Sequence, residues 1–198
     1  CIDALLSQTY EKFDLLIFDN ASTDGTFEII KRYVDTGEII YINTGSNLGG
    51  AGGFQYGIRY AAEHDYEFVW VMDDDCIPRE NTLEKFYEAD QILKGDYGFL
   101  SSKVLWKDGT ICYMNRQRKT VVQYNNDFTS QFVPIKMASF VSLFIPVKIV
   151  KNMGLPIKEF FIWTDDWEYT RRISIKYVCY LINSSVVIHK SKNNIGAN

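Results

Sequence analysis

Three adjacent carboxylates, Asp73, Asp74 and Asp75, directly follow five apolar residues in the sequence FVWVMDDDCIP. Like charges on neighbouring residues repel one another and resist burial, so a cation is the expected partner. Mg²⁺ and Mn²⁺ bind carboxylate oxygens together with the phosphate oxygens of a substrate. Asp73 and Asp75, on alternate positions, are therefore candidate ligands of a metal that holds a diphosphate. The alternative is a solvated turn that ends a strand, because Asp and Pro are common turn residues.

A second acidic pair, Asp165 and Asp166, stands between two tryptophans in the sequence WTDDWEYTRR. An aromatic face can cover the apolar side of a sugar ring, and a carboxylate can serve as a general base. The same acids also have a structural explanation at the start of a helix. Asp165 and Glu168 approximate a capping box, and Glu168 can pair with Arg172 one turn later. The residues alone leave both interpretations open.

The glycine-rich sequence NLGGAGGFQYG is typical of a loop whose backbone approaches a ligand before a helix begins. It does not match the dinucleotide fingerprint G-x-G-x-x-G, because Gln55 occupies the third glycine position when the count starts at Gly50. A phosphate-loop lysine motif is absent as well. The alternative is a permissive helix start with no ligand.

Two further features carry weaker signals. His189 ends the apolar run SSVVIH, where a lone histidine is more often structural, although imidazole is a good ligand for Mn²⁺. The basic run NRQRK at residues 115–119 predicts an exposed hairpin tip. Contact with an acceptor phosphate or with membrane headgroups is the alternative for this run.

The elements that position these residues follow from the apolar pattern. Three apolar runs, at residues 13–18, 39–43 and 68–72, alternate with two segments of helical spacing, at residues 23–34 and 52–64. Strand, helix and strand in units of about 30 residues predict right-handed βαβ crossovers. Ligands collect at the carboxyl ends of such strands, which is where the polar clusters fall. A convergent polar site is therefore expected.

The second half of the chain is less regular. Its pattern predicts two helices, at residues 82–93 and 164–176, and several strands. A strand segment is expected at residues 97–106, followed by a hairpin region through Tyr124. One or two strands are expected within residues 133–146, and two final strands at 177–183 and 184–190.

Composition limits the class of protein. The chain has 198 residues, 46% of them hydrophobic, which is enough for one domain with a substantial core. A net charge of −4 gives no overall attraction to nucleic acid, which argues against it as a main partner. The four cysteines show no CxxC pairing, which favours reduced thiols in the cytosol. The chain begins with Cys1 inside a helical pattern, so an upstream segment containing a first strand is expected.

Four motifs in this order resemble a family 2 glycosyltransferase: LLSQTYEKFDLLIFDNASTDGT, NLGGAGGFQYGI, VWVMDDDCIP and WTDDWEY. The resemblance covers nearly the whole chain, and within the family it is greatest to the galactofuranosyl- and rhamnosyltransferase branch. It implies an α/β GT-A fold with a mostly parallel central sheet flanked by helices and without its first strand. It also implies a single domain over residues 1–198, with a donor-binding half at 1–100 and an acceptor-binding half at 101–198.

The resemblance also assigns roles to residues. Asp19 would contact the base of the nucleotide, and Asn47, Gly49 and Gly50 would line its pocket. The metal and diphosphate site would comprise Asp73, Asp75 and His189, with Asp74 in the donor site but without a defined role. Asp166 would be the inverting base and Asp165 would orient the acceptor. The acceptor site would also include Trp163, Trp167 and Glu168. Thr164 departs from the branch, which tends to carry Trp at that position.

The implied activity is inverting, Mn²⁺- or Mg²⁺-dependent sugar transfer. The donor would be a UDP- or dTDP-sugar and the acceptor a glycan or lipid-linked saccharide of a bacterial cell-envelope polysaccharide. The expected location is cytoplasmic, with peripheral contact at the inner face of the membrane. The alternatives are a sugar-phosphate nucleotidyltransferase and a noncatalytic carbohydrate- or partner-binding module on the same scaffold.

Overall fold

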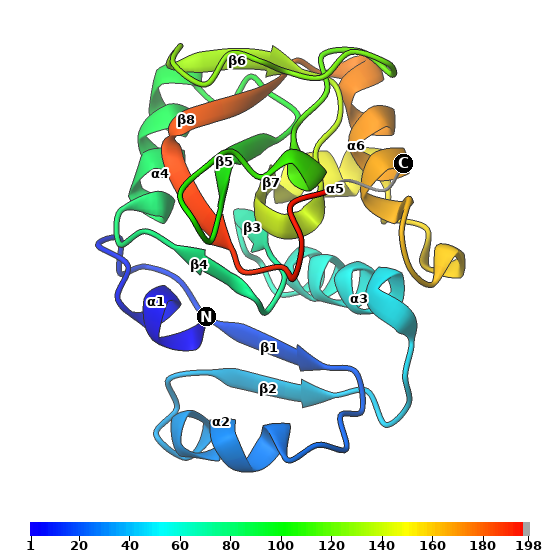
Figure 1. Cartoon of the computed structure of the whole chain (residues 1–198). Coiled ribbons are helices and arrows are strands. Elements are labelled where there is room, and N and C mark those ends of the chain that lie inside the picture. Colours follow the sequence, from blue (N-terminus) through cyan, green and yellow to red (C-terminus); the bar gives the residue numbers. More distant parts are fainter. Residues whose placement is uncertain (196–198) are drawn as a thin grey trace.

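Helices and two β-sheets alternate in the computed structural model of the chain, which describes residues 1–195 (Figure 1). The helices are α1 (Ile2–Leu6), α2 (Thr26–Asp35), α3 (Gly49–Glu63), α4 (Thr82–Leu93), α5 (Val147–Met153) and α6 (Asp165–Lys176). The strands are β1 (Leu16–Asp19), β2 (Ile40–Asn43), β3 (Phe68–Val71), β4 (Cys76–Pro78), β5 (Leu100–Trp106), β6 (Phe132–Ile135), β7 (Leu143–Pro146) and β8 (Cys179–His189). Within the described residues, no helix is long and apolar enough to cross a membrane.

The smaller sheet contains β1 and β2, which are parallel and connected by α2. Helix α2 turns Ile30 and Tyr33 toward a cluster that includes Ile39, so its apolar face covers this strand pair. The register places Asp19 opposite Asn43 at the carboxyl ends of the two strands. The predicted βαβ unit is therefore confirmed, and it brings two of the predicted polar clusters together.

The larger sheet has six strands in the order β3-β7-β5-β8-β4, with β6 paired to β8. Strands β3, β5 and β8 run in one direction, while β7 lies antiparallel between β3 and β5. Strands β4 and β6 are antiparallel to β8. The sheet is thus mixed rather than mostly parallel, because β7, β4 and β6 add antiparallel pairings to a parallel framework that helices connect.

Strand β8 is continuous, whereas the sequence pattern predicted two final strands. Its first part pairs with β6 and its last part with β4, and its register against β5 shifts between Ser102 and Lys103. The polar residues at its centre are hydrogen-bonded: the Asn183 side chain donates to the Ser130 carbonyl at 2.7 Å, and Ser185 Oγ lies 2.7 Å from Ser102 Oγ. These hydrogen bonds let the polar side chains stay inside a continuous strand, although Asn183 Oδ1 is buried without a partner among the described residues.

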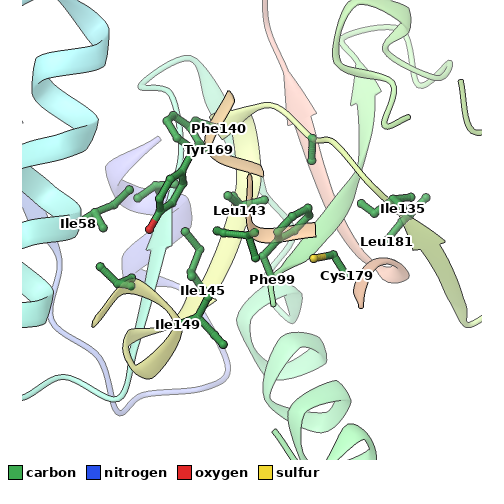
Figure 2. Close-up of a cluster of buried hydrophobic side chains, with 14 of the residues drawn as sticks. Ile58, Phe99, Ile135, Phe140, Leu143, Ile145, Ile149, Tyr169, Cys179 and Leu181 are labelled. Carbon is green, nitrogen blue, oxygen red and sulfur yellow. The ribbon is translucent and has the colours of Figure 1, made fainter. Parts of the chain in front are cut away.

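The main hydrophobic core lies between the larger sheet and helices α3, α5 and α6 (Figure 2). Ile58 of α3, Leu143 of β7 and Tyr169 of α6 are completely buried in it. Burial of each such side chain contributes roughly 1.5–3 kcal/mol. The core therefore holds two helices against the larger sheet: α3, which contains the glycine-rich sequence, and α6, which begins with the acidic pair. The three adjacent acids follow β3 of that sheet.

Candidate functional site

The ends of β4 and β8 place His189 beside the acidic turn that follows β3. Cys76 pairs with His189 across the two strands, and the backbone N–H of Lys190 donates to the Asp75 carbonyl at 3.0 Å. His189 Nε2 lies 3.1 Å from Asp75 Oδ1. The potential ligand atoms of Asp73, Asp75, Cys76 and His189 all lie within 4.8 Å of one another. The structure thus brings the three predicted metal ligands together from distant parts of the chain.

Asn115 fixes the orientation of the His189 ring. His189 Nδ1 lies 2.6 Å from Asn115 Oδ1, and because an amide oxygen only accepts, Nδ1 carries the proton. The Asn115 amide nitrogen in turn donates to Ser139 Oγ at 3.1 Å. This tautomer leaves a lone pair on Nε2, which faces Asp75 and is free to bind a cation.

Asn115 was placed on an exposed hairpin tip by the sequence pattern, and this prediction was wrong. Its side chain is 9% exposed, because a 3₁₀ turn at Tyr113–Asn115 folds it toward His189. Cys112 lies against the same group, with its Sγ 3.1 Å from Asn115 Oδ1. A three-residue turn and a contact across 74 positions leave no periodicity in the sequence, so no local signal pointed to Asn115.

The charge of the acidic turn favours a cation. Burial, together with the charges of Asp75, Asp74 and Asp165, raises the pKa of Asp73 to about 7. Burial raises the pKa of the Cys76 thiol as well, so the thiol is protonated and a poor ligand. Asp74 points into solvent, exposed. The remaining donors, Asp73, Asp75 and His189, suit Mn²⁺ or Mg²⁺, which prefer oxygen ligands and accept imidazole.

Helix α6 carries the second acidic pair. It begins at Asp165 after Thr164, and no side-chain bond caps it, so the capping box that the sequence allowed is not formed. Glu168 instead accepts two hydrogen bonds from the Arg172 guanidinium, of 2.7 and 2.9 Å. This is the i,i+4 ion pair that the spacing allowed. Asp165 is buried, 5% exposed. The helix therefore starts without a side-chain cap from Thr164 and with Asp165 buried at its first position.

Asp166 lies close enough to Asp73 for the charges of the two carboxylates to interact. Burial, followed by the charges of Asp165 and Asp73, raises the pKa of Asp166 to about 7. The backbone N–H of Trp167 donates to Asp166 Oδ1 at 2.6 Å and holds the carboxylate in place. A carboxylate whose pKa lies near neutrality is suited to accept a proton from a hydroxyl group.

The glycine-rich loop is held by Asn20, a residue to which the sequence motifs assigned no role. The Asn20 amide donates to the Gly49 carbonyl at 2.9 Å and accepts the Leu48 N–H at 2.8 Å. Asn47 Oδ1 accepts the Gly49 N–H at 2.8 Å. Polar side chains thus organise the start of α3 from both sides.

Gly49 is required by a close approach of two backbones. It has a φ of +72°, and a Cβ atom there would lie 2.2 Å from the Phe161 carbonyl oxygen. The same oxygen accepts the Ala51 N–H at 3.0 Å, so the loop before α6 closes on the start of α3. At Gly50 a Cβ atom would meet nothing within 4 Å. Of these two predicted pocket residues, only Gly49 therefore has no room for a side chain.

Asp19 organises the ends of β1 and β2. It is 5% exposed and accepts bonds from Tyr41 Oη at 2.5 Å, Asn43 Nδ2 at 3.0 Å and the Ser22 N–H at 2.9 Å. Burial opposes its ionisation, but these donors together lower the pKa of Asp19. The carboxylate is therefore charged at neutral pH and shapes the strand ends on which a nucleotide would lie.

The two tryptophans beside the acidic pair differ in exposure. Trp163 is 74% exposed and has a φ of +68°, which is uncommon for a residue other than glycine. Trp167 is partly buried, and the Arg118 guanidinium carbon lies 3.7 Å from its ring centroid. Trp163 is therefore available to a ligand, whereas Trp167 already packs against a cation.

Comparison with known proteins identifies the family. Residues 1–131 match the model described as "Glycosyl transferase family 2", which is more than half of the chain. The chain therefore belongs to glycosyltransferase family 2, a family of enzymes.

Two curated relatives share part of the sequence. The galactofuranosyltransferase GlfT1 of Mycolicibacterium smegmatis is 32% identical over 85 residues, which are 41% of this chain and 26% of that protein. The glycosyltransferase GlyG of Streptococcus pneumoniae serotype 4 is 29% identical over 92 residues, which are 46% of this chain and 30% of that protein. The matched region spans less than a third of either relative.

Solved structures share the fold. GalNAc-T7 with UDP, GalNAc and Mn²⁺ superposes with a TM-score of 0.76 at 12% identity, over 96% of this chain and 40% of that one. S. aureus TarS 1–349 in complex with UDP gives 0.69 at 15% identity, over 96% and 55% of the two chains. The fold is therefore GT-A, as the sequence motifs implied.

Proposed function

We propose that this protein transfers a sugar from a nucleotide-diphosphate donor to a hydroxyl group of a saccharide acceptor, with inversion at the anomeric carbon. The observation that carries the proposal is the proximity of two acidic groups with different surroundings. Asp73 and Asp75 lie with His189 in a cluster suited to a divalent cation, whereas burial, then the charge of Asp165 and then that of Asp73, raise the pKa of Asp166. One site would thus hold both a cation that binds the donor's diphosphate and a carboxylate that acts as a base.

The chain's own residues would divide the reaction as follows. Asp73, Asp75 and His189 would hold Mn²⁺ or Mg²⁺, which neutralises the charge that develops on the departing diphosphate. Asp166 would take the proton of the acceptor hydroxyl as its oxygen attacks the anomeric carbon. Asp165 would orient that hydroxyl. The new glycosidic bond forms opposite the bond that breaks, so the configuration inverts.

The donor and acceptor would bind on different halves of the domain. Asp19, Asn47, Gly49 and Gly50 lie at the ends of β1 and β2 and at the start of α3, where we place the nucleotide, with Asp74 beside the diphosphate. Trp163, Trp167 and Glu168 lie at the start of α6, where we place the acceptor. The metal cluster joins the halves, because its acids belong to residues 1–100 and its histidine to residues 101–198.

The relatives support a donor and a pathway. Both structural neighbours are complexes with UDP, and one also contains Mn²⁺, which supports a UDP-sugar and Mn²⁺ for this chain. Relatives that include galactofuranosyltransferases and a poly-β-1,6-N-acetyl-D-glucosamine synthase of Staphylococcus aureus support a role in cell-surface polysaccharide synthesis. Its four cysteines are all unpaired, which supports a reducing, cytoplasmic location.

The test is the release of UDP or dTDP from a panel of nucleotide sugars in the presence of saccharide acceptors and Mn²⁺. We expect release that needs both acceptor and metal, and its loss in Asp75→Ala. Asp96→Ala is the control, because Asp96 is exposed and its carboxylate lies outside the site. Release of pyrophosphate from a nucleoside triphosphate and a sugar phosphate would indicate a nucleotidyltransferase instead. Nucleotide binding without turnover would indicate a noncatalytic module.

A further inference from the structure

Two arginines lie between aromatic rings beside the proposed transfer site. The Arg116 guanidinium carbon is 5.5 Å from the Tyr113 ring centroid and 4.5 Å from that of Tyr124. The Arg118 guanidinium carbon is 4.5 Å from the Tyr124 centroid and 3.7 Å from that of Trp167. We call these five residues the arginine ladder.

The polar partners of both arginines are neutral. Arg116 Nη1 donates to Asn126 Oδ1 at 3.2 Å, while Arg118 donates from Nη1 to the Val121 carbonyl at 2.6 Å and from Nη2 to Tyr124 Oη at 2.8 Å. Among residues 1–195, neither arginine has a carboxylate within 4.0 Å. Two cations thus share one tyrosine ring without a counter-charge, which makes an anion the expected partner.

One edge of each guanidinium is buried in the protein, out of reach of a ligand. The Nε atoms of Arg116 and Arg118 are both inaccessible and have no hydrogen-bond partner within the described part of the chain. Buried donors without partners are rare in folded proteins and cost free energy. A surface cation that serves only solubility would leave its guanidinium in water, so this arrangement indicates that the arginines are held in place for recognition.

The ladder links the two sides of the site. Arg116 follows Asn115, which orients His189, and Trp167 follows the proposed base Asp166. The backbone of Arg118 is fixed by two bonds, from its N–H to the Met137 carbonyl at 2.9 Å and from the Lys136 N–H to its own carbonyl at 2.7 Å. The guanidinium groups are therefore carried on anchored backbone next to the place where the acceptor would lie.

We propose that the arginine ladder binds a phosphate group carried by the acceptor, as in a saccharide linked to a lipid through phosphate. The proposal rests on the proposed function. A planar guanidinium matches phosphate with two parallel bonds, and its stacking on Tyr124 and Trp167 fixes the fork in advance. The donor's diphosphate already has a partner in the metal cluster, so a separate pair of arginines serves a second phosphate.

The experiment is calorimetric titration of the full chain, saturated with UDP and Mn²⁺, with octyl phosphate and with the neutral analogue octyl glucoside. We expect octyl phosphate to bind, and the double variant Arg116→Gln/Arg118→Gln to weaken it at least about tenfold. Octyl glucoside binding should be unchanged. Lys151→Gln, which removes an exposed charge from α5, is the matched control.

A second variant separates recognition from folding. Arg118→Lys keeps the charge but removes the fork, so it should weaken octyl phosphate binding less than the double variant and leave the melting temperature close to that of the parent. Equal binding of octyl phosphate by the parent and the double variant would overturn the proposal, and so would its failure to bind the parent.

Titration of UDP with Mn²⁺ in the same variants distinguishes the two proposals. If the parent does not bind UDP with Mn²⁺, the proposed function fails. If it does but octyl phosphate binding is independent of the arginines, only the ladder proposal fails. If the double variant loses UDP and keeps octyl phosphate, the arginines serve the donor and the ladder proposal is again wrong.

Discussion

The cluster of Asp73, Asp75 and His189 and the acidic pair of α6 are held in different ways. Strand pairing fixes the backbone around this cluster. Strands β4 and β8 hold Cys76 opposite His189, and the Lys190 N–H donates a hydrogen bond to the Asp75 carbonyl. The acidic pair instead follows a loop in which Phe161, Trp163 and Thr164 all have positive φ. The loop exposes apolar side chains, with Ile162 at 61% exposure.

This difference fits the two proposed ligands. A cation needs donor atoms at fixed distances, which hydrogen-bonded strands supply. An acceptor must enter and leave at each turnover, and residues held in sparsely populated backbone conformations are found at such ligand clamps. We therefore expect changes at the strand side to act on donor and metal binding, and changes at the helix side to act on transfer.

The largest effect should come from Asp166→Asn. If Asp166 is the base, as we propose, its loss removes proton transfer, and the rate of UDP release with acceptor should fall by about 10²–10⁴-fold. The fall should appear in kcat, because amide and carboxylate have nearly the same shape. Asp96→Asn is the matched control, and an unchanged rate in Asp166→Asn would show that another group is the base.

Asn115→Leu should weaken metal binding while the metal ligands stay in place. Without an acceptor at Nδ1 the His189 ring loses its fixed tautomer, so Mn²⁺ affinity in the presence of UDP should fall by about 10–100-fold. Asn115→Asp keeps an acceptor oxygen and should retain most of the affinity. Calorimetric titration with Mn²⁺ measures both, and equal losses in the two variants would argue for a general packing defect.

The raised pKa of Asp166 also predicts how stability depends on pH without metal. The native carboxyl titrates at about 7 against an ordinary value of 3.8, so between these values the native state binds more protons than the unfolded state. The contribution of Asp166 to the free energy of unfolding therefore falls as pH rises from about 4 to 7. We therefore compare the free energy of unfolding of Asp166→Asn with that of the parent at two pH values. The difference, variant minus parent, should be about 1–3 kcal/mol larger at pH 8 than at pH 4.5.

Urea unfolding at the two pH values measures this difference. Asp96→Asn should run parallel to the parent, because its carboxylate is exposed. If the Asp166→Asn and parent curves also ran parallel, the carboxyl would titrate normally and the argument for a base near neutrality would lose its support.

The smallest effect separates two adjacent glycines. Gly49→Ala places a Cβ atom against the Phe161 carbonyl at a positive φ, so it should destabilise the protein by about 1–2 kcal/mol and loosen the contact between the loop and α3. Gly50→Ala meets open space and lies in the first turn of α3, so it should be neutral or stabilise by about 0.5–1 kcal/mol. Thermal unfolding of both variants checks the contrast, and equal effects would contradict it.

Local patterns in the sequence predicted much of the fold. The apolar runs correspond to β1, β2 and β3, and the helix expected at residues 82–93 is α4. The order of the strands in the larger sheet was not predictable, because β7 lies between β3 and β5 through contacts distant in sequence. The sequence of an apolar strand that is covered on both faces does not indicate which strands lie next to it in the sheet.

The candidate site was predictable where chemistry is concentrated in adjacent residues. Asp73, Asp75 and His189 were expected together and lie together, whereas the hydrogen bonds of Asn115 and Asn20 emerged only from the structure. The basic run that contains Arg116 and Arg118 was visible in the sequence, with an acceptor phosphate as one alternative, but its stacking on Tyr124 and Trp167 was not. These groups act through single hydrogen bonds or stacking contacts between distant segments. A polar residue in such a role looks like any loop residue in the sequence.

The most direct test of the account is a titration of UDP, with and without Mn²⁺, into Asp75→Ala and Asp166→Asn side by side. We expect Asp75→Ala to lose Mn²⁺-dependent UDP binding, while Asp166→Asn should bind UDP as the parent does and fail only in transfer. If UDP bound equally well without metal, or if both variants lost binding together, the division between a metal grip and a separate base would be contradicted.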